Sequence, residues 1–229
     1  MKIGQIQKTS LIDYPGKISM IIFTLGCNFS CPYCHNPELV DPGRFLDPIP
    51  EDEVVAFLKK RAGQIDAVVI TGGEPTIQAD LIKFMEKLKD MGYLIKLDTN
   101  GTNPEMLRKA IDKGIVDYIA MDIKAPLKMY DAITRTVVDT NSIKSSIQLI
   151  MDSPIQYEFR TTVSKSLLNT EDIMHIGHMI KGARTYVLQK FIPSKHVDQC
   201  FIHEISFTDD ELMNIKKELD SLVLNCIIR

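Results

Sequence analysis

Three cysteines fall within eight residues, at Cys27, Cys31 and Cys34, in the spacing C-x3-C-x2-C. Thiolates are soft ligands that suit iron–sulfur clusters and zinc. Both kinds of centre usually have four protein ligands. Three thiols can therefore hold three corners of a [4Fe–4S] cube and leave the fourth iron open to another ligand. The alternative, from the residues alone, is a structural zinc site completed by His35 or by the distant Cys200.

A glycine pair forms the second polar cluster, where Gly72, Gly73 and Glu74 directly follow an apolar run. Adjacent glycines let a ligand approach the main chain closely and expose peptide groups for hydrogen bonding. The simpler alternative is an ordinary tight turn, in which glycine is a common residue. The motif alone does not separate ligand binding from turn formation.

Acidic and basic residues end the next two predicted strands. Asp98 and Asn100 close one of them, and Asp122 and Lys124 close the other. An acidic group at a strand end can bind an ammonium group or ribose hydroxyls. Asp122 and Lys124 are two residues apart, which places them on one face of an extended chain. The alternatives are a plain Asn-Gly turn and a structural salt bridge.

Arg160 and Gln189 continue this pattern in the last two predicted strands, and Glu158 and Arg160 repeat the spacing of two residues. Arginine is rare inside a barrel unless it is paired with an acid or holds an anion. Polar residues thus recur at the carboxyl end of nearly every strand. We interpret this recurrence as one shared site, because unrelated turns would not follow the strands so regularly.

The remaining histidines and cysteines are interpreted as structural. His175 and His178 share a helical face, and with no third ligand apparent they are expected to be solvated or packed. Cys200 and His203 resemble half of a zinc site without its second half. Cys226 lies in an apolar run and is expected to be buried.

The elements that position the polar residues alternate between β-rich and helical patterns. Predicted strands cover residues 17–24, 66–71, 94–99, 117–123, 156–163 and 185–191. Predicted helices cover residues 50–63, 78–92, 104–114, 140–151, 170–182 and 208–226. Glycines close several of these helices, and acidic residues begin the last one, as is typical of helix ends.

Six strands that each precede a helix predict a parallel sheet with right-handed crossovers. We predict an α/β fold, a partial (β/α)6 TIM-type barrel with outer helices, as a single domain over residues 1–229. Segment 1–16 and helix 208–226 are expected as additions to the barrel. An open doubly wound sheet is the alternative, but it uses mainly one crevice, whereas a barrel gathers its site from all strand ends. The distribution of polar residues favours the barrel.

The composition excludes several classes of function. The formal net charge is −3, and no basic field argues for binding to nucleic acid or to an anionic membrane. No apolar run approaches the ~20 residues that span a bilayer, and the N-terminus lacks the apolar core of a signal peptide. We therefore expect a cytoplasmic protein with neither of these partners. Thiols stay reduced in that compartment, so clustered cysteines indicate metal or redox chemistry.

Taken together, these motifs resemble those of the radical S-adenosylmethionine (radical SAM) superfamily. The resemblance depends on C-x3-C-x2-C with Tyr33 before the last cysteine, and on GGE after the next strand. The segments SLIDYPGK, GCNFSCPYCHNPEL, TGGEPT, DTNG and MDIKAP are similar to those of glycyl-radical-enzyme activases, above all the anaerobic ribonucleoside-triphosphate reductase activating proteins. DTNG and MDIKAP also occur in pyruvate formate-lyase activating enzymes and do not separate the two groups.

The resemblance implies two cofactors. Cys27, Cys31 and Cys34 would ligate a [4Fe–4S] cluster, and the amino and carboxylate groups of SAM would chelate its fourth iron. The backbone at Gly72, Gly73 and Glu74 would hold the amino group of SAM. Tyr33 would present its main chain to the adenine.

The same resemblance assigns roles to the strand-end residues. Asp98, Asn100, Asp122 and Lys124 would line the side of SAM and substrate, and the two aspartates would help to bind a monovalent cation. Asp122 and Lys124 are also assigned to catalysis. Arg160 is assigned to cofactor binding by its strand position, and so is Gln189.

The implied activity is reductive cleavage of SAM to a 5′-deoxyadenosyl radical, which takes a hydrogen atom from a glycine Cα of a partner enzyme. The chain lacks the second cysteine cluster of longer activases, so an external donor such as flavodoxin or ferredoxin would supply the electron. One alternative is a pyruvate formate-lyase-type activating enzyme. Another is a radical SAM enzyme acting on a small molecule, such as a deazapurine-forming enzyme. The third is a non-catalytic zinc-binding module.

Overall fold

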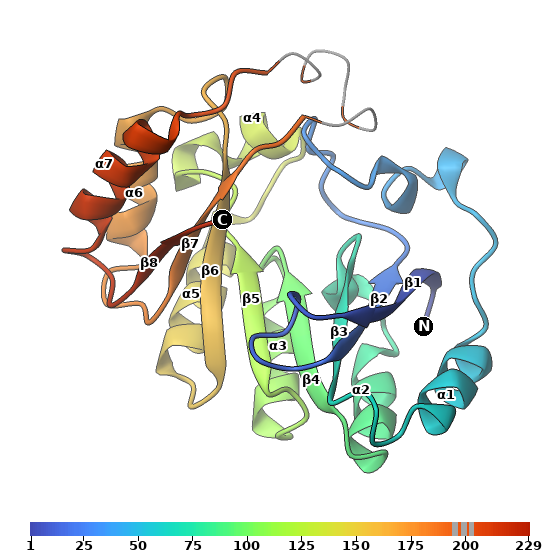
Figure 1. Cartoon of the computed structure of the whole chain (residues 1–229). Coiled ribbons are helices and arrows are strands. Elements are labelled where there is room, and N and C mark those ends of the chain that lie inside the picture. The colour runs from blue at the N-terminus through green and yellow to red at the C-terminus, as the bar shows by residue number, and fades with distance from the viewer. Residues whose placement is uncertain (194–196, 198–200, 202–203) are drawn as a thin grey trace.

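The computed structural model describes residues 1–193, 197, 201 and 204–229. Its eight strands form one sheet in sequential order, with β1 and β8 at the two edges. The strands are β1 Ile3–Ser10, β2 Ser19–Thr24, β3 Ala67–Gly72, β4 Leu94–Thr99, β5 Tyr118–Asp122, β6 Gln156–Val163, β7 Tyr186–Lys190 and β8 Cys226–Ile228. Strands β2 to β8 run parallel, and β1 pairs antiparallel with β2. The sheet is a curved, open barrel wall, as the sequence predicted (Figure 1).

Helices connect the parallel strands, and they pack on the outer face of the sheet except for the short α4, which lies beside the carboxyl ends of the strands (Figure 1). They are α1 Glu51–Lys60, α2 Leu81–Asp90, α3 Pro104–Asp112, α4 Tyr130–Thr134, α5 Thr140–Asp152, α6 Thr170–Met179 and α7 Asp209–Leu219. Short 3-10 turns are η1 Pro37–Leu39, η2 Pro42–Arg44, η3 Pro75–Ile77 and η4 Leu127–Met129. Within the described residues, no helix combines the length and apolar character needed to cross a bilayer.

The structure adds detail at the N-terminal end of the chain and corrects one prediction at the C-terminal end. Segment 1–16 was expected as an addition to the barrel, and its residues Ile3–Ser10 form strand β1, which pairs antiparallel with β2. The last helix was expected over 208–226, but α7 ends at Leu219, and Cys226 begins strand β8 instead. The apolar run at the end of the chain is too short for its period to distinguish a helix from a strand, and pairing with β7 decides the outcome.

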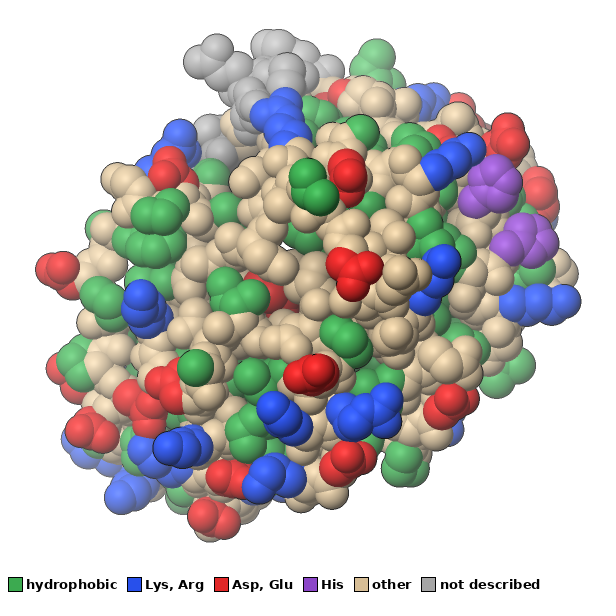
Figure 2. Space-filling model, turned by 180° about the vertical axis from the view of Figure 1, so that it is seen from behind, with side chains coloured by type: hydrophobic (Ala, Val, Ile, Leu, Met, Phe, Trp, Pro, Cys, Tyr) green, Lys and Arg blue, Asp and Glu red, His purple; other side chains and the backbone are tan. Residues whose placement is uncertain are grey.

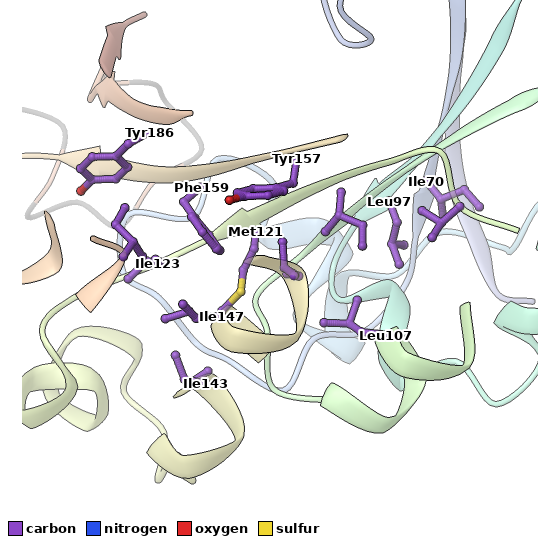
Figure 3. Packing of buried hydrophobic residues seen from close by; sticks show 14 of the residues in the cluster. Ile70, Leu97, Leu107, Met121, Ile123, Ile143, Ile147, Tyr157, Phe159 and Tyr186 are labelled. Carbon is purple, nitrogen blue, oxygen red and sulfur yellow. The ribbon is translucent and has the colours of Figure 1, made fainter. Parts of the chain in front are cut away.

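The outer layer of the core lies between the sheet and the helices. Ile70, Leu97 and Met121 point from β3, β4 and β5 toward Leu107 of α3 and Ile147 of α5 (Figure 3). Each such side chain contributes about 1.5–3 kcal/mol when it is removed from water. On the side of the molecule opposite to the view of Figure 1, acidic and basic side chains are interspersed with apolar ones (Figure 2). The helices are amphipathic, and packing of their apolar faces against the sheet holds them in place.

The inner face of the sheet is filled at the amino ends of the strands by the loop that joins β1 to β2. Tyr14 of this loop packs on Tyr118, with ring centroids 5.8 Å apart. Lys96 Nζ donates a 2.8 Å hydrogen bond to the main-chain oxygen of Asp13. The lower half of the barrel interior is thus occupied by protein side chains, which leaves the carboxyl ends of the strands for a ligand.

Candidate active site

A cavity of about 370 Å³ lies at the carboxyl ends of the parallel strands. Every residue that the sequence assigned to the site lines it, although the residues come from six different strand ends. These residues are Cys27, Cys31, Tyr33, Cys34, Gly72, Gly73, Glu74, Asp98, Asn100, Asp122, Lys124, Arg160 and Gln189. The parallel arrangement brings them together because all these strands end at the same edge of the sheet.

The cysteine loop after β2 is held by main-chain hydrogen bonds to three other segments. Gly26 N donates to Leu39 O at 2.7 Å, Gly26 O accepts from Glu74 N at 2.8 Å, and Ser30 N donates to Thr134 O at 2.9 Å. The three cysteines are free and partly exposed. The fold therefore fixes the backbone of the loop and leaves its thiols facing the cavity.

Burial controls the protonation of these thiols. It raises the pKa of Cys27 to about 12, and the charge of Glu74 adds to the effect. Burial also raises the pKa values of Cys31 and Cys34, although the ammonium of Lys124 opposes the rise in both. The thiols are therefore neutral near pH 7 in the protein alone. Binding of a metal centre must displace their protons, since the thiolate is the ligand.

The glycine pair has a structural role that the sequence did not indicate. A Cβ on Gly73 would lie 1.9 Å from the oxygen of Gly26, and one on Gly72 would lie 2.3 Å from the nitrogen of Thr24. Gly72 also has a φ of +111°, which disfavours side chains. The glycines allow close contact between the end of β3 and the start of the cysteine loop. The need for glycine here arises from contact between two backbone segments, whereas the sequence analysis attributed it to the approach of a ligand or to a tight turn.

Glu74 joins the ends of β3 and β4. Its buried carboxylate accepts hydrogen bonds from Thr76 N at 3.0 Å, Thr76 Oγ1 at 2.6 Å, Thr99 Oγ1 at 2.8 Å and Asn100 N at 2.6 Å. Burial raises the pKa of Glu74, although these four donors oppose the rise. The Asn100 amide then donates to Asn28 Oδ1 at 2.9 Å, which connects β4 to the cysteine loop.

A network of charged side chains lies at the base of the cavity. Arg160 Nε lies 2.7 Å from Asp122 Oδ1, and Arg160 Nη1 lies 3.1 Å from Asp98 Oδ2. Lys124 Nζ lies 3.1 Å from Asp122 Oδ2. Lys96 Nζ lies 3.1 Å from Asp98 Oδ1, in contact but without hydrogen-bond geometry. Both aspartates are therefore paired with cationic side chains of the protein.

Asp122 and Lys124 keep their charges at neutral pH. Burial alone would raise the pKa of Asp122, but the attraction of Arg160 and Lys124 outweighs it and holds the pKa below its usual value. Burial would lower the pKa of Lys124, but the charge of Asp122 raises it well above the usual value. Asp122 and Lys124 thus form the salt bridge that was one of the two alternatives, and they do so in the wall of the cavity.

The sequence did not indicate the roles of Lys96 and Asn28, which contact residues of the site. Lys96 stands two residues before Asp98, the same spacing that drew attention to Asp122 and Lys124, so a signal was present. Asn28 bonds both Asn100 and Thr102, but a polar residue between cysteines gives no signal of such contacts.

The other histidines and cysteines lie apart from the cavity or outside the described residues. His175 and His178 are exposed on α6, and Cys226 is buried on β8, as predicted. Cys200 and His203 lie outside the described residues.

Among the described residues, which do not include Cys200, no ligand set for zinc is assembled. His35 Nε2 lies 3.1 Å from the main-chain oxygen of Ile192, and its ring packs on Phe191 at 5.4 Å. In the part of the chain that the structure describes, no three His, Cys, Asp or Glu side chains gather as the ligands of one ion. A [4Fe–4S] cube differs from zinc in this respect, because it binds each thiolate at a separate iron.

Residues 21–178, which are more than half of the chain, match the sequence profile of the Radical SAM superfamily. The chain belongs to the radical SAM superfamily. Among its relatives, a Methanocaldococcus jannaschii protein that carries the provisional name glycyl-radical enzyme activating enzyme MJ1227 is 34% identical over 99% of this chain and 95% of its own length. The 7-carboxy-7-deazaguanine synthase of Thermococcus kodakarensis is 26% identical over 76% of this chain and 74% of its own.

The fold of this radical SAM enzyme is also found among solved structures. The crystal structure of QueE from Escherichia coli has a TM-score of 0.59 at 14% identity, and the match covers 100% of this chain and 93% of that one. At this identity the likeness establishes the fold alone. It agrees with the partial barrel described above.

The cavity fits the two groups that the radical SAM family implies, a [4Fe–4S] cluster and SAM. Its donors are three thiols of one loop, and it extends from these thiols to Lys124 and Arg160. Its volume of about 370 Å³ lies in the range of ~300–1,000 Å³ that is usual for small-molecule sites. Cationic groups at its base suit the carboxylate of a bound amino-acid moiety.

Proposed function

We propose that this radical SAM enzyme is an activase that generates a glycyl radical on a partner protein. The proposal depends mainly on one observation: three free thiols share a cavity with the paired charges of Asp122, Lys124 and Arg160. The relative from M. jannaschii, similar over nearly its full length, supports the assignment to activases.

Cys27, Cys31 and Cys34 would hold the [4Fe–4S] cluster, and the edge of Gly72–Glu74 would hold SAM. When bound, these groups supply one-electron cleavage of the C5′–S bond, so that the products are methionine, 5′-deoxyadenosine and a glycine Cα radical on the partner. The residues of this chain would place the groups close together and would exclude water from them, which limits side reactions of a primary radical.

The remaining site residues would position the ligand. Tyr33, through its main chain, and Asn100 would face the nucleoside. Asp122 and Lys124 would contact SAM or the substrate, and Gln189 would complete the wall from β7. Each of these residues lines the cavity, where a bound ligand would contact it.

The partner is proposed from the sequence motifs. Anaerobic ribonucleoside-triphosphate reductase is the first choice, and pyruvate formate-lyase is the second. The chain has five cysteines, of which three stand in the loop, so no second cluster motif is present to relay electrons. An external donor such as flavodoxin or ferredoxin would supply them. The protein would act in the cytoplasm, without nucleic-acid or membrane partners.

The test is anaerobic incubation of the reconstituted protein with SAM, a one-electron reductant and each glycyl-radical enzyme in turn. We expect the electron-spin-resonance doublet of a glycine radical with the correct partner. A partner whose radical glycine is replaced by alanine is the control and should give no doublet. Absence of the doublet with every glycyl-radical enzyme, despite SAM cleavage, would contradict the proposal.

A second candidate function is a radical SAM reaction on a small molecule. The similarity to a 7-carboxy-7-deazaguanine synthase favours it. The same incubation separates the two functions through its products. An activase should form about one 5′-deoxyadenosine per partner radical, whereas a small-molecule enzyme should convert its substrate over many turnovers without a protein partner.

A further inference from the structure

The pair Asp98 and Asp122 raises the question of which cation neutralises it. Resemblance to activases implies a monovalent metal ion between these two aspartates. The structure instead places a guanidinium there, because Arg160 contacts Asp122 through Nε at 2.7 Å and Asp98 through Nη1 at 3.1 Å. The implied ion therefore does not fit the residues that are present.

We propose that Arg160 is the cation of this site, built into strand β6 in place of a monovalent metal ion. Within the proposed function, it is a positioning residue that holds Asp98 and Asp122 at fixed places beside the SAM site.

The strand register explains why Arg160 reaches both acids. Asp122 and Arg160 are direct partners in the parallel pairing of β5 with β6. Asp98 lies on β4, on the other side of β5. The long side chain of Arg160 therefore extends from β6 past Asp122 on β5 to Asp98 on β4. The side chain of Arg160 is only 12% exposed, so this geometry is fixed by packing.

The cationic side chains around Asp98 and Asp122 leave no unpaired carboxylate oxygen for a metal ion. All four carboxylate oxygens of Asp98 and Asp122 lie within 3.1 Å of a cationic nitrogen, from Arg160, Lys96 or Lys124. Three positive charges thus face two negative ones. A metal ion would be a fourth positive charge in a partly buried space, where repulsion is screened little. It would also have to displace one of these nitrogens from an oxygen.

The surplus positive charge has a consequence for the ligand. The network carries one net positive charge at the base of the cavity, and Lys124 and Arg160 both line that cavity. An anionic group of a ligand, such as the carboxylate of the methionine part of SAM, would neutralise it. We therefore expect affinity for SAM to depend on Arg160 and to be independent of the metal cation in the buffer.

The first experiment measures the dissociation constant of SAM with the anaerobically reconstituted wild-type protein. Chloride salts of potassium, sodium and N-methyl-D-glucamine are compared at an ionic strength of about 0.15 M. We expect the three values to agree within about twofold, well below the tenfold change that 1.4 kcal/mol would give. Loss of affinity by tenfold or more in N-methyl-D-glucamine would overturn the proposal.

The second experiment uses Arg160→Met, which leaves two acids with two lysines. We expect SAM binding to weaken by about tenfold or more in N-methyl-D-glucamine, and potassium to restore part of it. Arg160→Lys should remain insensitive to the cation, because it keeps the charge. Lys113→Met removes one charge from an exposed pair with Glu86 and is the matched control, which should change nothing. A response to potassium equal to that of the wild type would overturn the proposal.

Crystals soaked in rubidium chloride give a readout that is independent of SAM cleavage. We expect no anomalous peak between Asp98 and Asp122 in the wild type, and a peak there in Arg160→Met. A peak in the wild type would overturn the proposal even if Arg160→Met did not fold. If the ion results hold but no glycyl radical forms on any partner, only the proposed function fails.

Discussion

At the scale of single residues, the cysteines of the chain separate into two environments. Cys31 is partly exposed in the cavity wall, whereas Cys226 is 1% exposed on β8. We expect Cys31→Ala to abolish binding of a [4Fe–4S] cluster and to leave the melting temperature of the iron-free protein nearly unchanged. Iron and sulfide assays after anaerobic reconstitution, together with thermal unfolding, measure the two effects.

Cys226→Ala provides the reciprocal control for this prediction. It should keep the full iron content but lower the stability by about 1 kcal/mol, because it removes a buried sulfur atom from the core. Normal iron content in Cys31→Ala would remove the basis for assigning the loop to a cluster.

Glu74 illustrates how a residue of a binding motif can be structural. Four hydrogen-bond donors face its carboxylate. In Glu74→Gln an amide group must face at least one of them, for example Asn100 N, and a buried donor loses its acceptor. We expect the free energy of unfolding to fall by about 1–3 kcal/mol in urea titrations. Glu86→Gln, at an exposed pair with Lys113, should change it by less than about 0.5 kcal/mol. Equal effects would contradict this role.

At the scale of elements, contact between the end of β3 and the cysteine loop depends on the absence of a side chain at Gly73. In Gly73→Ala the new Cβ would meet Gly26 O at 1.9 Å, so one of the two segments must move. We expect a loss of about 1–3 kcal/mol in stability and a lower iron content after reconstitution. Thermal unfolding and iron assays measure both.

Gly43→Ala is the matched control for the element-scale prediction. Gly43 lies in the exposed turn η2, where an added Cβ has its nearest neighbour, Asp41 Oδ1, at 3.4 Å. It should leave both measurements unchanged. If Gly73→Ala behaved in the same way, the close approach would not control the position of the loop.

At the scale of the whole molecule, carboxyl groups with lowered pKa values govern the response to acid. Arg160 and Lys124 overcome the effect of burial and lower the pKa of Asp122, and the hydrogen bond from Lys165 lowers that of Glu211 to about 2. In the unfolded chain these groups titrate near pH ~4. Below that pH the unfolded state binds more protons, so their contribution to stability is complete above pH ~4.5 and is lost as the pH falls toward ~2.

We therefore expect urea unfolding of the iron-free protein to show a steep loss of stability between about pH 4.5 and pH 2.5. A buried, paired carboxyl contributes on the order of 2 kcal/mol to such a loss. In Asp122→Asn the loss over this range should be shallower, because one of these groups no longer titrates. A loss as steep as that of the wild type would show that the titration of Asp122 does not contribute.

The sequence by itself determined the spacing of the three thiols and the order of the central strands and helices. The spacing of Cys27, Cys31 and Cys34 is local, and so is the alternation of strand and helix from residue 17 to residue 190. Patterns of this kind are visible along the chain, because backbone propensity and side-chain period act over a few residues. The structure accordingly confirms the six central strands and the first five predicted helices within a few residues, whereas the helix predicted over 208–226 ends at Leu219.

The tertiary structure decided which residues of distant segments contact each other. Arg160 meets Asp98 and Asp122 because β6 and β4 flank β5, and Glu74 meets Asn100 because β3 lies beside β4. Strand β8 exists because β7 offers it an edge, so the terminal residues pair and do not continue the helix. These contacts join residues far apart in the chain. Their energies arise only when the sheet has assembled, so no local pattern encodes them.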